Sequence, residues 1–329
     1  MKEKKIFQNR KVVVLCAVIS TLLWGSAFPC IKTGYRLFGI EAGDVGSQLL
    51  FAGIRFLLAG LLTLLLSLFL EKRGERQKVD RAQNRERGDF YKLVGGVLLL
   101  GLVQTGLQYI FYYIGMAHVS GVKGAILNGT SAFLCVLMAR ICYGKKETLS
   151  REKIVGCIVG LMGVILVNLG GSGTGAGEMF TGSFSLLGEG FMLISAVMVA
   201  LGAWLSKEVS QKIKPVTLCG WQLLAGGLLL VIIGELAGGR VDWQCAGVTG
   251  IFLMGYMIFI SAAAFALWTI LLKYNRMGQV TVFQFLIPVF GTLLSAVFLN
   301  ESIGNPVTLI SLPLVCAGIY FVNRDTAAC

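Results

Sequence analysis

The sequence has few charged residues, almost no histidine and no paired cysteines. Only 14% of its 329 residues are Asp, Glu, Lys or Arg, whereas an average soluble domain carries about 25%, so an ordinary soluble enzyme is excluded. The single histidine, His118, excludes a bis-imidazole haem or a histidine-rich metal centre within one chain. None of the nine cysteines lies in a CxxC pair, so neither a zinc site nor a disulfide framework is indicated.

Signals for a cofactor or for nucleic acid are also missing. There is no GxxxxGK[ST] motif, so the chain itself does not use ATP directly, and we expect neither a metal nor another cofactor. The net charge of +12 raises the question of nucleic acid. However, the densest basic stretch lies in a loop expected at 71–92, which mixes both signs of charge without the aromatic interleaving of a nucleic-acid platform.

What the sequence has in abundance is apolar runs of membrane-spanning length. The mean hydropathy is +0.77 and there are 43 glycines against 5 prolines, as in apolar helices that pack closely in lipid. A bilayer crossing needs about 20 apolar residues. The predicted spans are 12–31, 46–70, 93–117, 119–143, 154–169, 184–206, 216–236, 246–272, 280–299 and 307–322. We therefore predict an all-α polytopic membrane protein with ten transmembrane helices.

The distribution of basic residues gives these helices a direction. With the N-terminus inside, 24 of the 29 Lys and Arg fall in cytoplasmic segments, and only four fall outside. This agrees with the positive-inside rule, so both termini are expected to be cytoplasmic. The basic residues 1–11 precede an apolar run without a small-x-small cleavage site, so we expect a retained first helix in the cell membrane rather than a removed signal.

The chain contains an internal repeat. The segment 163–168, GVILVN, matches 318–323, GIYFVN, and segments 121–133 and 278–290 align at nearly the same spacing. Each half, 12–169 and 184–323, then holds five spans, and because five is odd the second half must be inserted in the opposite direction. Inverted repeats are typical of secondary transporters, which open a shared midplane site to either side in turn.

Several short motifs follow one another along the chain. They are Leu23-Trp24-Gly25-Ser26-Ala27-Phe28 with Lys32, Arg55-Phe56, Gly188-Glu189, and Pro288-Val289-Phe290 with Asn300-Glu301. Over residues 12–323 this pattern resembles the EamA branch of the drug/metabolite transporter superfamily. The resemblance implies two antiparallel five-helix halves around a central cavity. It also implies movement of small metabolites or drugs, frequently amino acids and often as export.

Two charged residues inside apolar runs are candidate site residues, since intramembrane charges are costly. Glu189 lies roughly 8 Å into the sixth span at 1.5 Å per residue. It is either a cation- or proton-binding carboxylate with a pKa raised by burial, or a structural acid bonded to neighbouring backbone. Arg55 either clamps a substrate carboxylate or forms a structural pair with Glu189 or Glu235.

Other candidates are polar or aromatic. Lys32 and Lys123 either snorkel to water or attract anionic solutes. Asn128 and Gln284, at near-equivalent positions of the two halves, either bind a solute or bond between helices.

Trp24 and Trp268 are expected to line the pathway and to stack on a solute. Pro288 is expected to kink the ninth span. The predicted pathway residues are thus Trp24, Asn128, Glu189, Trp268 and Gln284.

The function that these features favour is secondary transport of a small organic solute by alternating access, as an exporter. The alternative is an integral membrane enzyme that acts on lipid-linked substrates. Such an enzyme requires clustered catalytic residues or a metal site in a loop near the membrane, but the loop 71–92 has neither His nor Cys. The lipid bilayer and a small molecule are therefore the expected partners, and the sequence does not set the oligomeric state.

Overall fold

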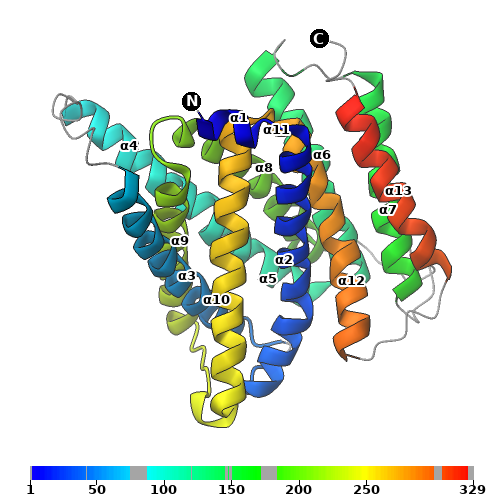
Figure 1. Cartoon of the computed structure of the whole chain (residues 1–329). Coiled ribbons are helices and arrows are strands. Elements are labelled where there is room, and N and C mark those ends of the chain that lie inside the picture. The colour runs from blue at the N-terminus through cyan, green and yellow to red at the C-terminus, as the bar shows by residue number, and fades with distance from the viewer. Residues whose placement is uncertain are drawn as a thin grey trace.

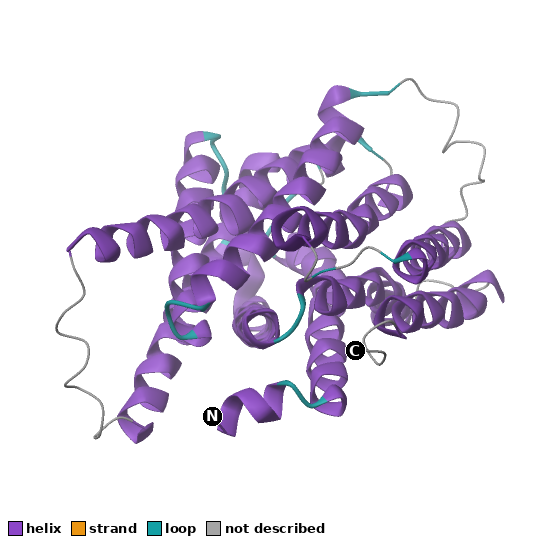
Figure 2. Ribbon diagram, turned by 90° about the horizontal axis from the view of Figure 1, so that it is seen from above, coloured by secondary structure: helices purple, strands orange, loops and turns teal. Residues whose placement is uncertain are grey.

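The structure is a computed structural model in which the described residues form helices joined by short loops (Figure 2). The described residues are 2–41, 43–74, 87–119, 121–144, 147, 150–171, 184–299 and 306–324. Across these ranges there is no strand, so the all-α prediction is confirmed for the part of the chain described.

The helices follow the apolar runs. The first group comprises α1 (Lys2–Phe7), α2 (Arg10–Leu37), α3 (Val45–Gly74), α4 (Arg87–Leu100), the π-helix η2 (Gly101–Leu107), α5 (Gln108–His118), α6 (Gly121–Tyr143) and α7 (Arg151–Gly171). The second comprises the π-helix η5 (Leu186–Gly190), α8 (Phe191–Ser210), α9 (Pro215–Leu236), α10 (Trp243–Tyr274), α11 (Met277–Thr281), the 3₁₀ helix η6 (Val282–Phe285), α12 (Leu286–Leu299) and α13 (Pro306–Arg324). The predicted loop 71–92 is shorter than expected, because α3 and α4 extend into it.

The protein is a multi-pass membrane protein. Within the described residues, seven helices are long and apolar enough to cross a bilayer. Two shorter apolar stretches, Leu127–Tyr143 and Ile310–Arg324, lie within or overlap the predicted spans 119–143 and 307–322. A further predicted span, 154–169, lies in α7. The membrane class is therefore confirmed, whereas the count of ten spans stays a prediction.

Side-chain caps define where several helices begin. The Asn9 side chain accepts a hydrogen bond from the Lys11 N–H at 3.0 Å, and the Asp242 carboxylate accepts from Gln244 and Cys245 N–H groups at 2.9 Å. Before α3, Asp44 accepts from the hydroxyl and the N–H of Ser47, and these hydrogen bonds lower the pKa of Asp44. Each cap satisfies an N–H group that has no partner within its helix.

Glycines allow the long helices to approach one another closely. On α3 and α9, a Cβ at Gly60 would lie 2.5 Å from the Leu224 nitrogen, and a Cβ at Gly227 would lie 2.4 Å from the Leu57 nitrogen. On α7 and α13, a Cβ at Gly156 would lie 2.7 Å from the Gly318 oxygen. These small residues bring backbones into contact, which is how apolar helices associate in lipid.

The bundle has two edges and a middle layer. α7 and α13 pack side by side at one edge, α3 and α9 pack together towards the other, and α2 lies between α10 and α12 (Figure 1). The helix α1 and the last turn of α13 lie at the same end of the bundle (Figure 1). We call this end the terminal end, and the end that holds the α2–α3 connection the distal end.

Candidate functional site

A cavity of about 470 Å³ lies between helices of both halves of the chain. Its walls come from α2, α3, η2, α5, α6, α8, α10, η6 and α12. The residues that line it from α2 fall between Trp24 and Tyr35, and those from α3 between Gln48 and Arg55. These segments flank the α2–α3 connection, so the cavity lies towards the distal end, where the exposed residues Lys32 and Ala117 mark its mouth.

The cavity brings together four of the five predicted pathway residues. Trp24, Asn128, Trp268 and Gln284 all line it. The two described charge candidates, Arg55 and Lys32, line it as well. The side chain of Lys123 and the segment Asn300-Glu301 lie outside the described part of the chain.

Aromatic rings form much of the wall. The ring centroid of Trp24 lies 5.1 Å from that of Trp268 and 5.2 Å from that of Phe265, in edge-to-face arrangements. Phe56, behind the wall, lies 6.0 Å from Phe265 and 4.6 Å from Tyr109. Tyr35, Tyr112 and Tyr113 complete this lining. Edge-to-face ring pairs stabilise packing beyond the area that they bury, so the wall is held in one arrangement.

Arg55 places a positive charge in this wall. Its side chain is 4% exposed, and its guanidinium carbon lies 4.2 Å from the centroid of the Phe56 ring. Tyr35 and Tyr109 lie near enough to interact electrostatically with it. No ion pair between Arg55 and an acidic side chain occurs in the described ranges, and the predicted partner Glu235 is exposed.

Side-chain amides supply the uncharged polar groups. Gln48, Gln104, Gln108, Asn128 and Gln284 all line the cavity. The Gln104 oxygen is buried without a hydrogen-bond partner, and the Gln284 oxygen accepts only a weak 3.9 Å hydrogen bond from the Cys135 thiol. Each amide can both donate and accept, so this part of the cavity can bind a polar group of a solute.

Glu189 is not brought into the cavity with the other candidates. It is buried in η5, where its carboxylate accepts a hydrogen bond from the Ser185 N–H at 2.9 Å. In return, the Ser185 hydroxyl accepts from the Gly188 N–H at 3.2 Å. This reciprocal arrangement is a capping box in which the acid lies one residue later than usual. The carboxylate of Glu189 is thus bonded to neighbouring backbone, and both interpretations of this residue stay predictions.

Pro288 lies near the start of α12. Its missing N–H would otherwise donate to the carbonyl of Gln284, one turn earlier, and the chain is 3₁₀-helical over η6, which contains Gln284. The departure from α-helical geometry therefore falls just before the proline rather than at it. Gln284, which lines the cavity, is in this irregular turn.

The terminal end of the bundle is tied together by polar contacts. The Tyr143 hydroxyl donates to the Glu208 carboxylate at 2.6 Å, which joins α6 to α8. The Lys207 ammonium donates to the carbonyls of Leu272 and Asn275, which joins α8 to the end of α10. Glu147 and Lys153, both buried, form an ion pair at 4.0 Å. These contacts close the end that lies opposite the mouth of the cavity.

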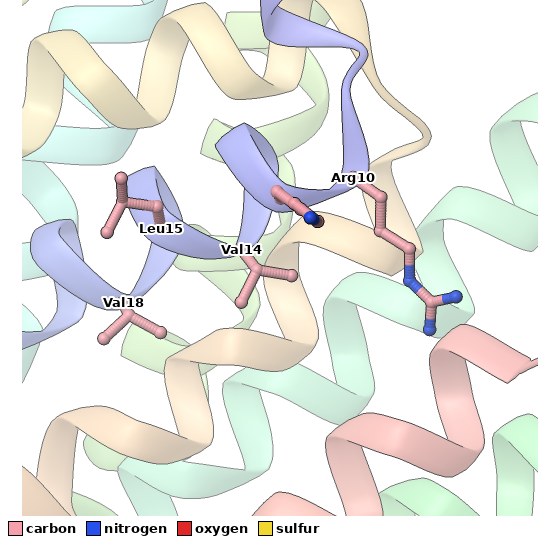
Figure 3. Close-up of a pocket in the computed structure, with 5 residues that line it drawn as sticks. Arg10, Val14, Leu15 and Val18 are labelled. Atoms are coloured by element: carbon pink, nitrogen blue, oxygen red, sulfur yellow. The ribbon is translucent and has the colours of Figure 1, made fainter.

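A second hollow lies on the outside of α2 near its start. It is lined by Arg10, Lys11, Val14, Leu15 and Val18 (Figure 3). All five residues belong to one helix, and Val14 and Leu15 are exposed. The hollow is an open, apolar surface without the converging polar groups of a small-molecule site, so it is not the candidate site.

Sequence reasoning missed most of the cavity wall. Tyr35, Tyr109, Tyr112 and Tyr113 were not predicted, although Tyr109 and Tyr113 recur at the four-residue spacing that places side chains on one helix face. Gln104 and Gln108 share the same spacing just before them. The Gln104–Gln108 stripe does predict a water-facing or bundle-facing side of this helix, and the tyrosines that continue it were the part not predicted.

Comparisons with known proteins identify the family. The model of the EamA-like transporter family matches residues 11–169 and again residues 186–324. The chain belongs to the EamA-like transporter family. Because the two matches cover most of the chain, the family resemblance noted in the sequence is confirmed.

The relatives of this EamA protein are named as transporters. The uncharacterized transporter YvbV of Bacillus subtilis (strain 168) is 25% identical, over 99% of this chain and 95% of that protein. The uncharacterized transporter sll0355 of Synechocystis is 23% identical, over 94% and 89%. A solved crystal structure matches with a TM-score of 0.72 at 18% identity, over 96% of this chain and 98% of that chain; it shows the fold alone. The protein is thus a membrane-embedded solute transporter. This agrees with the expectation that it is not an enzyme.

Proposed function

We propose that this EamA protein is a secondary transporter that moves a small organic solute through the cavity by alternating access. The observation that carries the proposal is the cavity itself, which is lined from both halves and lies near one end while polar contacts close the other. Its volume of about 470 Å³ is within the usual range for small-molecule sites, about 300–1,000 Å³. The arrangement corresponds to a state open at the distal end.

We also propose ten spans in two inverted five-helix halves, 12–169 and 184–323. Exchanging the halves pairs α2 with α8, α6 with α12 and α3 with α9. The contacts support this, because α2 packs on α12 as α6 packs on α8, and α3 packs on α9, its own counterpart. α7 likewise packs on its counterpart α13. The two separate matches to one family model support the same division.

We propose that the protein lies in the cell membrane with both termini on the cytoplasmic side. The support for this orientation is the excess of Lys and Arg in the segments on that side and the position of α1 and the end of α13 at one end (Figure 1). The cavity then faces outward, and we propose net export, which the family resemblance implies. Before a solute can be taken up from the cytoplasm, the contacts at the terminal end must open.

The test is a transport assay on the purified full-length protein in proteoliposomes, combined with a topology assay. A mixed metabolite panel inside the vesicles is expected to yield at least one solute whose efflux exceeds that of protein-free vesicles. Tags at the two termini are expected to be protected in intact cells. The absence of efflux for every solute, or one exposed terminus, would overturn the proposal.

A further inference from the structure

The cavity contains a buried positive charge that no acidic side chain in the described ranges neutralises. Arg55 is 4% exposed, lines the cavity, and has a buried Nε atom without a hydrogen-bond partner. Tyr109 and Tyr35 beside it are neutral phenols under ordinary conditions. Burying a guanidinium within a membrane protein costs free energy, and such a group almost always has a counterion or faces a water-filled space. The position of Arg55 in the cavity wall therefore suggests that something negative binds there.

The described residues that line the cavity include no Asp or Glu, whereas they include two cations, Arg55 and Lys32. The acids closest in the chain to the distal end have other positions or roles. Asp44 and Asp242 cap helices, and Glu189 accepts from the backbone of Ser185. Glu41 and Glu235 are exposed and do not line the cavity.

Among the described residues, the charge of Arg55 therefore makes the environment of a solute in the cavity positive. An anion gains Coulomb energy in this environment, because a charge in a partly apolar wall is screened less than it would be in bulk water. A cationic solute would be repelled by the same charge.

The rings arrange the apolar part of the site relative to this charge. From the guanidinium, a series of ring contacts runs through Phe56, Phe265 and Trp24 to Trp268, with centroid separations of 6.0, 5.2 and 5.1 Å. The charge and the two indoles are thus at opposite ends of one aromatic series. A solute that uses both must carry its negative group on an apolar or aromatic body.

We propose that the transported solutes are small organic anions. In this proposal, which rests on the proposed transport function, a carboxylate pairs with Arg55 and an apolar or aromatic body packs against Trp24 and Trp268. A planar guanidinium can bind a carboxylate through two parallel hydrogen bonds. The carboxylate supplies the missing partner of Nε and the missing countercharge, and both are lost again when the solute leaves.

The first experiment uses the unaltered protein, so it does not depend on the folding of any variant. Binding to the full-length protein in nanodiscs is measured by tryptophan fluorescence for four probes with one benzene ring. They are phenylacetate, phenylalanine, phenylethanol and phenethylamine, which are anionic, zwitterionic, neutral and cationic. Phenylacetate is expected to bind about tenfold to a hundredfold more tightly than phenylethanol, the range for hydrogen bonds to charged groups. Phenethylamine is expected to bind most weakly.

The second experiment removes the charge. The variant Arg55→Gln is expected to abolish the preference for phenylacetate over phenylethanol, whereas Arg55→Lys is expected to retain part of it. Arg36→Gln is the matched control, because Arg36 is an exposed arginine at the distal end of α2 and does not line the cavity. The control is expected to bind all four probes as the unaltered protein does.

The outcomes separate this inference from the transport function. If phenethylamine or phenylethanol binds as tightly as phenylacetate, or if phenylacetate does not bind saturably, the anion inference is overturned. Proteoliposome transport of another solute then still supports the transporter. If phenylacetate binds through Arg55 but no organic anion crosses the membrane, the binding site stands and the transport function falls.

Discussion

The indole rings of Trp24 and Trp268 meet edge to face at 64°, one from each half of the chain. Trp268 is 2% exposed, whereas Trp24 is partly exposed and its ring nitrogen is buried without a hydrogen-bond partner. The pair therefore joins the two halves at the wall of the cavity. Any movement that opens the cavity to the other side must preserve this contact or break it.

Replacement of Trp24 tests whether the ring contact forms part of the binding site. Trp24→Ala is expected to weaken solute binding by about twofold to tenfold, because an aromatic pair contributes about 0.5–1.5 kcal/mol. Trp24→Phe retains a ring and is expected to lose less. Trp221→Ala is the control, since Trp221 is exposed on α9 and does not line the cavity. Equal effects of Trp24→Ala and Trp221→Ala on titration with phenylacetate would contradict this role.

Glu189 allows its two interpretations to be separated. Because its carboxylate caps η5 and does not line the cavity, Glu189→Gln, which keeps an acceptor oxygen, is expected to leave the pH profile of proteoliposome transport unchanged. Glu189→Ala removes the cap and is expected to cost about 1 kcal/mol of stability, seen as a lower unfolding temperature. If Glu189→Gln abolished the pH dependence of transport, a proton-binding carboxylate would be the correct interpretation.

The buried ion pair at the terminal end predicts an asymmetric response to mutation. Lys153→Met leaves the charge of Glu147 buried without this countercharge, and one oxygen of Glu147 already has no hydrogen-bond partner. Breaking such a pair is expected to cost about 3 kcal/mol. Adding Glu147→Gln to Lys153→Met is expected to recover much of this loss. Thermal unfolding in detergent measures both, with the exposed Lys212→Met as control.

The close crossing of α3 and α9 predicts a strong effect of one methyl group. A Cβ at Gly227 would lie 2.4 Å from the backbone nitrogen of Leu57, so Gly227→Ala must displace the helices. The expected cost is about 1–3 kcal/mol. Gly255→Ala on α10 is the control, since its Cβ would meet nothing within 4 Å. An equal unfolding temperature for the two variants would rule out the tight crossing.

The class of fold was predictable because it follows from composition and the length of apolar runs. Long apolar helices have to satisfy their own backbone hydrogen bonds in lipid, so such runs allow few alternatives. The irregular turn before Pro288, at Val282–Phe285, follows from a proline that the sequence marks. The π-helices at Gly101–Leu107 and Leu186–Gly190 contain no proline and were not predicted.

The site was predictable only for residues of unusual chemistry. Arg55, Asn128 and Gln284 stand out as polar groups in apolar runs, and all three line the cavity. Tyrosines do not stand out, since they occur in membrane interfaces as well as in cavities. Glu189 also stands out as an acid in an apolar run, but it does not line the cavity, and its carboxylate accepts from the backbone N–H four residues earlier.

Alternating access is tested most directly by the reactivity of one cavity position from both sides of the membrane. Ala27 lines the cavity, and Ala27→Cys in a chain whose native cysteines are replaced by alanine provides a single thiol there. A membrane-impermeant thiol reagent is expected to label this variant in both right-side-out and inside-out vesicles, with rates that phenylacetate changes in both. Ala59→Cys, at a fully buried position away from the cavity, is expected to stay unlabelled. Labelling of Ala27→Cys from one side alone, unaffected by solute, would contradict a transport pathway through this cavity.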